Sequence, residues 1–342
     1  MKTFCFLLAA LLSIVLLFLL NLASGSVYIP LSDVMSILTF GKENAGISDT
    51  LRYIVIESRL PQALMALFGG AALAVSGLLL QTAFRNPLAG PDVFGINSGA
   101  ALAVSLVMLA MGGSVTIGSY SVTGYLAVLL AAFVGAMLVT GIIFLFSTLV
   151  KSSLMLLIIG LMIGYVASSI ISLLNFFATA EGVKSYMVWG FGSFGNVGLD
   201  AIPVALVVIL FALMVALCLV KPLNALLLGE SYAANLGVNV HRFHQLLLIL
   251  TGILTATVTA FCGPISFIGL ATPHIARLLM ATDNHRKILP MTLLLGSVIA
   301  LFCNWLSALP CENGIIPLNA ITPLLGAPII IYVLLKHKLH SL

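Results

Sequence analysis

Charged residues are scarce in this chain, and their scarcity excludes a soluble fold. Asp, Glu, Lys and Arg make up only 7% of the 342 residues, whereas 61% are hydrophobic. An ordinary soluble domain carries about 25% charged residues and could not hide so many apolar side chains from water. The net charge of +4 is small and scattered, so it does not indicate nucleic-acid binding. The composition predicts an integral membrane protein.

Two further absences narrow the chemistry. The five cysteines show no CxxC or Cys/His ligand spacing, so neither a metal site nor a metal cofactor is indicated. Cys262 and Cys311 are expected near the same membrane face, and whether they form a disulfide stays open. The Gly41-Lys42 pair lacks the spacing of a phosphate-binding loop. Energy for uphill transport would therefore have to come from another chain.

Long apolar runs are abundant, and a window of about 20 residues finds ten candidate membrane spans. The first run, Phe4 to Leu22, has 19 residues and exceeds the roughly 7–15 of a cleaved signal peptide, so a retained helix is expected over 1–22. The predicted spans are 4–22, 62–82, 98–111, 123–147, 153–178, 201–220, 243–262, 268–281, 288–309 and 321–335.

Basic residues are distributed unequally between the two sides of these spans. With the N-terminus in the cytoplasm, the outer segments hold only Lys42, Arg52, Arg59 and Lys184. The inner segments hold Lys2, Arg85, Lys151, Lys221, Arg242, Arg277, Arg286, Lys287, Lys336 and Lys338. Because positive residues favour the cytoplasmic side, both termini are predicted to be cytoplasmic.

Acidic residues and histidines are missing from the interior of the predicted spans. All ten acidic residues and all six histidines fall in loops or at helix ends. Proton- and sodium-coupled carriers usually need such groups at membrane depth, and an intramembrane hydrolase needs buried catalytic groups. The pattern argues against both classes and against an enzyme.

Small and polar residues recur at helical spacing within two spans. In the fifth span these residues form a single helix face. That face could pack against another helix or line a translocation path, and the residues alone leave both roles open. That face consists of Gly160, Gly164, Ser168, Ser172, Asn175 and Thr179. In the second span, close packing is favoured for the corresponding face, which consists of Ala66, Gly70, Ala74, Gly77 and Gln81.

Two Gly/Pro breaks precede the short third and eighth spans. The segment 85–91 contains Pro87 and Pro91, and Gly263-Pro264 interrupts the chain later. We expect the two breaks on opposite sides of the membrane, as an inverted repeat of spans 2–5 and 7–10 would require.

The longest interior loop, 221–242, is not simply polar. Helix-forming residues stand between Gly229 and Gly237, with apolar positions at Ala233 and Leu236. Such a helix could lie on the membrane surface or dock a cytoplasmic partner, and the residues alone leave both roles open.

Several motifs in order resemble the FecCD-like group of ABC transporter permeases, which import iron chelates and cobalamin. The resemblance runs from about Arg59 to Lys336. It rests on Arg59-Leu60-Pro61, Asn86-Pro87-Leu88-Ala89, Trp189-Gly190, Leu228-Gly229-Glu230, Gly263-Pro264-Ile265-Ser266-Phe267-Ile268-Gly269-Leu270, Pro273-His274-Ile275-Ala276-Arg277 and Thr322-Pro323-Leu324-Leu325-Gly326-Ala327-Pro328.

The resemblance implies an all-α bundle of about ten transmembrane helices, like that of a cobalamin-importer permease, in a single domain over 1–342. It implies three kinds of partner: two cytoplasmic ATPase subunits, an extracytoplasmic substrate-binding protein and a second permease copy. The second copy would be identical or a close paralogue. The 221–242 loop becomes a coupling loop that contacts the ATPase through Gly229, Glu230, Ala233, Leu236 and Gly237.

Other site residues follow from the same resemblance. Gly164, Ser168, Ser172 and Asn175 become pathway-lining residues near a two-fold axis. Arg59 is expected to dock the binding protein, with a role in the fold as the alternative. The chain departs from the family at Gln62 and in the 311–318 loop, so Arg52 is a further docking candidate.

The sequence thus predicts a multi-pass permease of the cell inner membrane, surrounded by lipid. It would import a chelated metal (iron-siderophore, haem or cobalamin) by alternating access, driven by ATP hydrolysis in a separate chain. The alternative is a stand-alone channel or secondary carrier without an ATPase partner.

Overall fold

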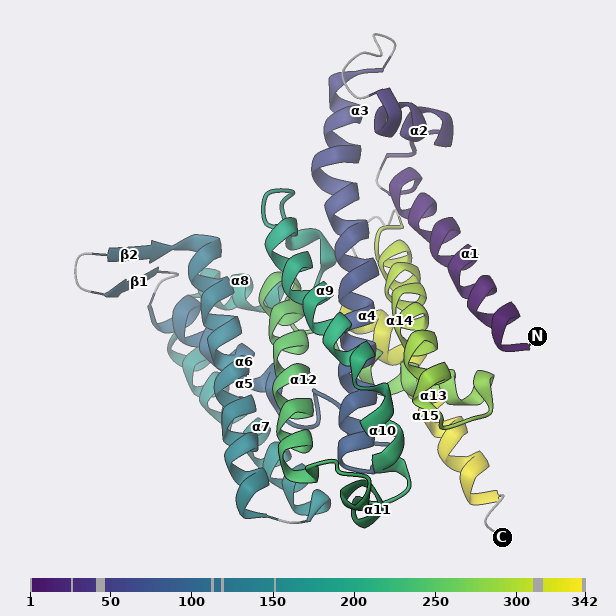
Figure 1. Cartoon of the computed structure of the whole chain (residues 1–342). Helices are drawn as coiled ribbons and strands as arrows, with labels where there is room; N and C mark the ends of the chain where they lie inside the picture. Colours follow the sequence, from purple (N-terminus) through teal and green to yellow (C-terminus); the bar gives the residue numbers. More distant parts are fainter. Residues whose placement is uncertain are drawn as a thin grey trace.

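The computed structural model describes residues 2–25, 27–40, 47–111, 114–117, 120–150, 152–309 and 316–339, and it is a bundle of helices (Figure 1). The long helices are α1 (Lys2–Ala23), α4 (Leu60–Ala83), α6 (Gly124–Leu149), α7 (Ser153–Phe177), α9 (Ile202–Cys218), α12 (Val240–Cys262), α14 (His285–Ser307) and α15 (Leu318–Leu339). The shorter helices are α2 (Leu31–Phe40), α3 (Asp49–Tyr53), α5 (Ile96–Ser105), α8 (Ala180–Gly190), α10 (Val220–Leu227), α11 (Glu230–Asn235) and α13 (Ile268–Met280).

Short irregular elements complete the chain. Two π-helical segments, η2 (Ile54–Arg59) and η3 (Leu106–Ala110), continue α3 and α5, and η4 (Phe194–Asn196) is a 3-10 turn. Strands β1 (Ser114–Ile117) and β2 (Tyr120–Thr123) form an antiparallel hairpin in which Ser114 pairs with Thr123. The helical fold class predicted from the sequence is confirmed, with this hairpin as a small addition.

Each of the ten predicted spans coincides with a helix, but the count of ten spans is not confirmed. Among the described residues, six helices are long and apolar enough to cross a membrane, or seven if the bent pair α9–α10 counts as one span. The axes of that pair differ by 54°. Two apolar helices, Ile96–Ala110 and Leu318–Tyr332, are shorter, and α13 has only 13 residues.

Polar side chains define where several helices begin. Ser152, Asn239 and Thr179 accept hydrogen bonds from backbone N–H groups in the first turns of α7, α12 and α8, respectively. These N–H groups have no partner within their own helix, so the caps stabilise the helix ends. Local sequence therefore sets these boundaries.

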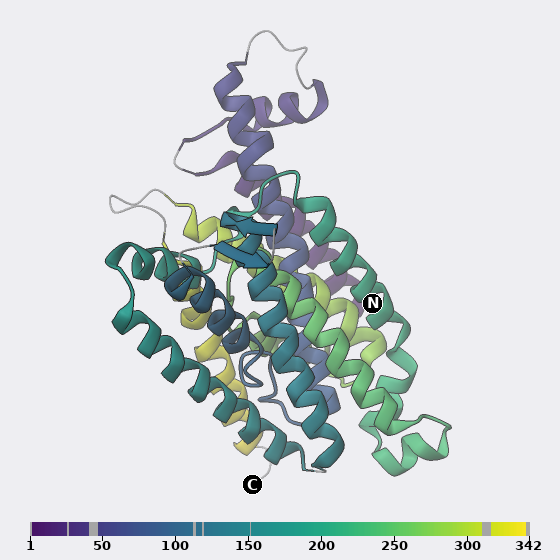
Figure 2. The same cartoon turned by 90° about the vertical axis from the view of Figure 1, so that its left-hand side faces the viewer.

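The second predicted span begins earlier than the sequence suggested. Helices α3, η2 and α4 form one continuous helical run from Asp49 to Ala83, which has 35 residues rather than the 21 expected from 62–82. Such a helix is about 50 Å long, whereas the hydrocarbon core of a bilayer is about 30 Å thick. Its first turns pack with α2 around a separate apolar cluster and project beyond the bundle (Figure 2).

The core lies around α4 and α12. In the most apolar windows of these two spans 83% and 78% of the residues are buried, against 17% in α7 and 11% in α1. The small-residue face of α4 explains the close packing: a Cβ on Gly70 would lie 2.4 Å from Gly296 O, and one on Gly77 only 1.7 Å from Gly269 O. The predicted packing role of this face is confirmed.

Candidate functional site

Helix α11 projects from one end of the bundle, which we call the α11 end; the end that carries α2 is the α2 end (Figure 1). Gly229 and Gly237 flank α11 with φ angles of +130° and +85°, which L side chains rarely adopt. Ala233 is fully buried, whereas Tyr232 and Leu236, one helical turn apart, are 48% and 60% exposed. A small rigid helix thus presents an apolar face away from the protein.

The connection from α10 to α11 is attached to the end of α4. Arg85 donates a hydrogen bond from Nη2 to the carbonyl of Leu226, at 2.8 Å. Within the turn, the N–H of Ala233 donates to Gly229 O at 2.8 Å and that of Val238 donates to Ala233 O at 3.0 Å. The predicted coupling residues therefore lie in one internally bonded turn that follows the attached end of α10.

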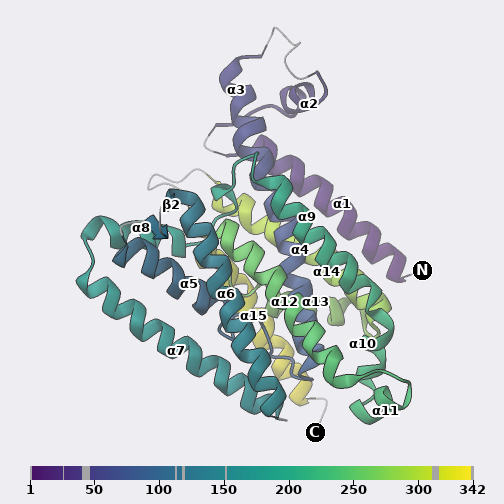
Figure 3. The ribbon, with the colours of Figure 1, turned by 60° about the vertical axis from the view of Figure 1, so that its left-hand side comes forward.

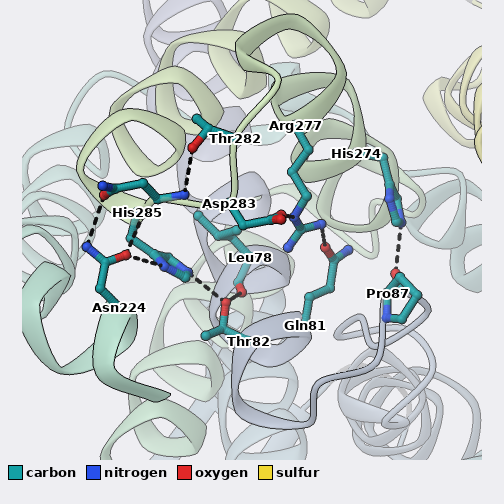
Figure 4. Close-up of polar contacts among 11 residues, drawn as sticks. Leu78, Gln81, Thr82, Pro87, Asn224, His274, Arg277, Thr282, Asp283 and His285 are labelled. Carbon is teal, nitrogen blue, oxygen red and sulfur yellow. Dashed lines mark hydrogen bonds and ion pairs between the residues drawn. The ribbon is translucent and has the colours of Figure 1, made fainter. Parts of the chain in front are cut away.

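A polar network connects this region to three core helices, as Figure 4 shows. We call it the Gln81–His285 network, and its members are Gln81, Thr82, Asn224, Arg277, Asp283 and His285. On one side, Arg277 Nη1 donates to Gln81 Oε1 at 2.6 Å, and its Nε lies 3.6 Å from the Asp283 carboxylate. Gln81 Nε2 donates in turn to Leu270 O at 3.2 Å. These bonds join α4 to α13.

The other side of the network joins α10 to α14 and α4. Asn224 Oδ1 accepts from the backbone N–H of His285 at 2.8 Å and lies 3.2 Å from its Nδ1. His285 Nε2 lies 2.8 Å from the Thr82 hydroxyl. Since α10 ends only two residues before α11, these contacts place α11 close in the chain to residues that contact α4 and α14.

The two Gly/Pro breaks meet inside the bundle rather than lying apart at opposite surfaces. The N–H of Phe267 donates to Asp92 Oδ2 at 3.2 Å, and Asp92 also contacts Asn97. Asn97 Oδ1 accepts from the Thr259 hydroxyl at 2.8 Å. Each short helix, α5 and α13, starts after a left-handed residue, Gly95 or Phe267. The connection from α4 to α5 and that from α12 to α13 start at opposite ends of the bundle and converge inside it. An inverted repeat requires such an arrangement.

Asn319 of α15 holds the second break in place. Its Nδ2 donates to Pro264 O at 2.7 Å and to Gly190 O at 3.0 Å, while its Oδ1 accepts from the N–H of Ser266 at 3.1 Å. One amide therefore links the 263–267 segment to the end of α8 and to α15.

The small-residue face of α7 has two different environments. A Cβ on Gly160 would lie 2.7 Å from Phe94 Cα, and one on Gly164 would lie 3.4 Å from Ser98 Oγ, so this half packs against the start of α5. Ser168 and Ser172 are exposed at the edge of the bundle, where α7 lies (Figure 3). Asn175 Oδ1 is buried without a hydrogen-bond partner among the described residues.

The two arginines predicted to dock a binding protein are engaged within the chain. Arg59 is 7% exposed and donates from Nη1 to Leu22 O at 2.8 Å and to Ala23 O at 2.9 Å. Its Nη2 also contacts Val27 O. Backbone carbonyls at and just after the end of α1 are therefore the partners of Arg59 among the described residues.

Arg52 pairs with Asp49 at 2.9 Å, and its side chain is only 13% exposed. Gln62, where the chain departs from the family pattern, donates to Asn304 Oδ1 at 3.0 Å. Cys311 and the start of the altered 311–318 loop lie outside the described residues, as do Lys42 and Lys151. Cys262 is buried and forms no disulfide with another described residue, so its pairing with Cys311 stays untested.

Sequence analysis missed the Gln81–His285 network and the contact of Asp92 with Phe267. Each of these side chains belongs to a loop or helix end when viewed along the chain, which gave no reason to place them together. The Pro91-Asp92 pair before a short apolar helix was the one local signal for a buried carboxylate, since Asp at such a position can bond the turn that follows.

Comparison with known proteins gives a consistent result. The model of the FecCD transport family matches residues 12–336. The chain is 35% identical over 283 residues to the vitamin B12 import system permease protein BtuC of Salmonella typhi, covering 82% of this chain and 83% of that protein. The same identity and coverage hold for the protein of this name from Salmonella newport.

Solved structures agree with this result. A metal-chelate type ABC transporter in an inward-facing conformation matches with a TM-score of 0.81 and 29% identity, over 96% of this chain and 98% of that one. PsaBC from Streptococcus pneumoniae, in complex with Fab, matches with a TM-score of 0.50 and 16% identity, which shows a similar fold alone.

Proposed function

Since the chain belongs to the FecCD transport family and is a permease of the ABC importer type, we propose that it carries a chelated metal, either an iron-siderophore, haem or cobalamin, by alternating access. Two similarities support this cargo class. The BtuC relatives are named for vitamin B12 import, and the structure with the higher TM-score is of the metal-chelate type.

The observation that carries the proposal is the geometry of α11. An exposed apolar pair, Tyr232 and Leu236, stands on a short helix that lies between two glycines and follows α10, whose last turn accepts a hydrogen bond from Arg85. In this proposal α11 presses into a groove on a cytoplasmic ATPase subunit, with Glu230 at its first turn and Ala233 against the bundle. The α11 end is then cytoplasmic. Closure of the two ATPase subunits moves α10 and α11 together as a rigid body.

The exposed part of the α7 face supports a second permease copy at this edge. Ser168 and Ser172 are exposed in the described part of the chain, and the buried Asn175 Oδ1 lacks a partner there. If these residues line a pathway, the opposite wall must come from another chain. We therefore place the pathway between two copies, identical or paralogous, and assign Gly164 to packing within the copy.

The α2 end is the proposed docking surface for an extracytoplasmic substrate-binding protein. It projects beyond the bundle and exposes Tyr28, Met35 and Tyr53. Arg52 belongs to this end through α3 and is retained as a candidate contact together with its exposed partner Asp49, since charged groups at a docking surface guide encounter. Arg59 is better described as an anchor for α1, because its guanidinium is directed at the carbonyls of that helix.

The test is ligand-stimulated ATP hydrolysis in proteoliposomes that contain the permease, its ATPase and its binding protein. Ferrichrome-type chelates, haem and cobalamin are compared in parallel. Glu230→Arg combined with Leu236→Asp should abolish stimulation while the protein still inserts. Lys287→Glu, a charge reversal at another exposed position of the α11 end, is the matched control and should leave stimulation intact.

Three outcomes are informative. Stimulation by a single ligand, lost in the double variant and kept in the control, supports both the importer and the coupling role of α11. Equal loss in both variants would remove the special role of α11. If the ATPase neither copurifies nor responds to any ligand, and the permease alone conducts, the proposal fails in favour of a stand-alone channel or carrier.

A further inference from the structure

A cavity of about 570 Å³ lies on the opposite side of the bundle from α11, where α6 and α8 meet the end of α12. We call it the outer cavity. Its walls include Met108 after α5, Tyr125 of α6, Glu181 and Trp189 of α8, and Phe261 of α12. None of the predicted coupling or docking residues lines it, and of the small-residue face of α7 only the end residue Thr179 does.

The lining combines three aromatic rings with one carboxylate. Tyr125, Trp189 and Phe261 supply the rings, and Glu181 is the only charged residue among the lining residues. Neither of the two ion pairs formed between described residues involves Glu181. Aromatic faces attract cations through their quadrupole, and a neighbouring carboxylate adds a counter-charge. This combination favours an organic ammonium ion over an anion or a neutral polar molecule.

A simpler explanation accounts for the position of Glu181 but not for its surroundings. Glu181 lies in the first turn of α8, where the helix dipole favours an acidic side chain. The cap itself is already supplied by Thr179, whose hydroxyl accepts from the N–H of Gly182. The dipole does not require three rings and an open volume beside the carboxylate.

The cavity has the size and rigidity of a ligand site. Its volume falls in the range of about 300–1,000 Å³ that is common for small-molecule pockets. Trp189 is only 8% exposed, and its ring stacks on that of Tyr186 with centroids 6.3 Å apart. Its carbonyl faces Gly263, where an added Cβ would lie 2.5 Å away. The indole is therefore held in place before any ligand binds.

We propose that the outer cavity binds an organic ammonium group, with the cation against the aromatic rings and the Glu181 carboxylate as its counter-ion. Two sources carry this chemistry: the headgroup of an aminophospholipid at the membrane surface, and an amine-bearing solute or cargo molecule. The proposal does not rest on ATP-driven import, since binding is measured on the purified permease without an ATPase.

The fluorescence of Trp189 can report binding in the outer cavity. Its two tryptophans are Trp189 and Trp305, and Trp305→Phe leaves Trp189 as the sole indole fluorophore. The Trp305 Nε1 has no hydrogen-bond partner among the described residues, so phenylalanine is a mild replacement. The protein is purified in a maltoside detergent, which carries no ammonium group, and titrated with choline, ethanolamine and tetramethylammonium. The uncharged isostere 3,3-dimethylbutanol and sodium chloride serve as ligand controls.

The expected result is a saturable change in Trp189 emission with the ammonium compounds and none with the controls. Glu181→Gln, in the same background, should weaken binding by roughly tenfold or more, because a cation then loses its counter-charge. Asp200→Asn is the matched control, since Asp200 is an exposed carboxylate that does not line the cavity. Far-UV circular dichroism of each variant confirms that the helices are intact.

Reconstitution separates the two sources. In nanodiscs that contain phosphatidylethanolamine, a lipid headgroup in the cavity would raise the apparent dissociation constant of choline relative to nanodiscs of phosphatidylglycerol alone. Equal constants in the two lipids assign the site to a soluble amine. No saturable response to any ammonium compound, an equal response to 3,3-dimethylbutanol, or unchanged affinity in Glu181→Gln would each overturn the proposal.

Discussion

The contact between α4 and α13 is close enough that a single methyl group should separate the two helices. A Cβ on Gly77 would lie 1.7 Å from Gly269 O, 2.5 Å from its carbonyl carbon and 2.9 Å from its Cα. An ordinary carbon–oxygen contact is about 3.3 Å, so Gly77→Ala requires the helices to separate by roughly 1.5 Å. All three obstructing atoms belong to the backbone and cannot rotate away.

The free-energy change follows from three terms. Overpacking typically destabilises by about 1–3 kcal/mol, and a backbone obstacle places this case at the upper end. Separation would also break the 3.2 Å bond from Gln81 to Leu270 O, a loss of about 1 kcal/mol. The higher helix propensity of alanine offsets about 1 kcal/mol of this destabilisation. We expect a net destabilisation of about 3 kcal/mol.

Thermal unfolding in detergent, followed by circular dichroism, measures this effect. Gly141→Ala is the matched control, because Gly141 lies within α6 and a Cβ there would meet nothing within 4 Å. The control should unfold at the wild-type temperature or slightly above it. Gly269→Ala tests the same contact from α13, since its Cβ would lie 2.8 Å from Leu73 O. Unfolding of Gly77→Ala at or above the wild-type temperature would refute the reasoning.

Three other substitutions test the contacts described above. Arg59→Met leaves the carbonyls at the end of α1 without a charged donor and should destabilise by about 2–3 kcal/mol; an unchanged unfolding temperature would disprove the anchor role. Asn319→Ala removes three hydrogen bonds around the 263–267 segment, with an expected loss of about 2–3 kcal/mol and faster proteolysis there; protection equal to wild type would contradict this. Asn224→Ala should lower transport per ATP hydrolysed several-fold in proteoliposomes while the ATPase still binds, whereas an unchanged ratio would show that α10 does not act through α14.

Local sequence was sufficient wherever a prediction depended on neighbours along the chain. Hydrophobic runs located all ten helical segments, because a bilayer admits only helices with internally bonded backbones or closed barrels. Gly229 and Gly237 marked the ends of the coupling turn, and the apolar positions between them divided into a buried Ala233 and an exposed Leu236. The motifs also identified the family, which the comparisons confirm.

Predictions that depended on contacts between residues far apart in the sequence were less accurate. Arg59 resembled a surface cation along the chain, but the end of α1 folds back over it and supplies carbonyl partners. The hydrophobic window placed the start of the second span at residue 62, whereas the same helix begins at Asp49. Asp92 was grouped with loop carboxylates, yet it bonds the segment that leads into α13.

By itself the sequence determined the membrane class, the helical segments, the family and the turn between Gly229 and Gly237, since composition, periodicity and glycine placement act over one or two helical turns. Only the tertiary structure decided which helix faces meet and which polar groups they enclose. Gly77 against Gly269, Thr82 beside His285, and the cavity that Glu181 lines together with three aromatic residues bring together distant parts of the chain. Such contacts depend on where the long helices cross one another, and no local sequence pattern specifies a crossing point.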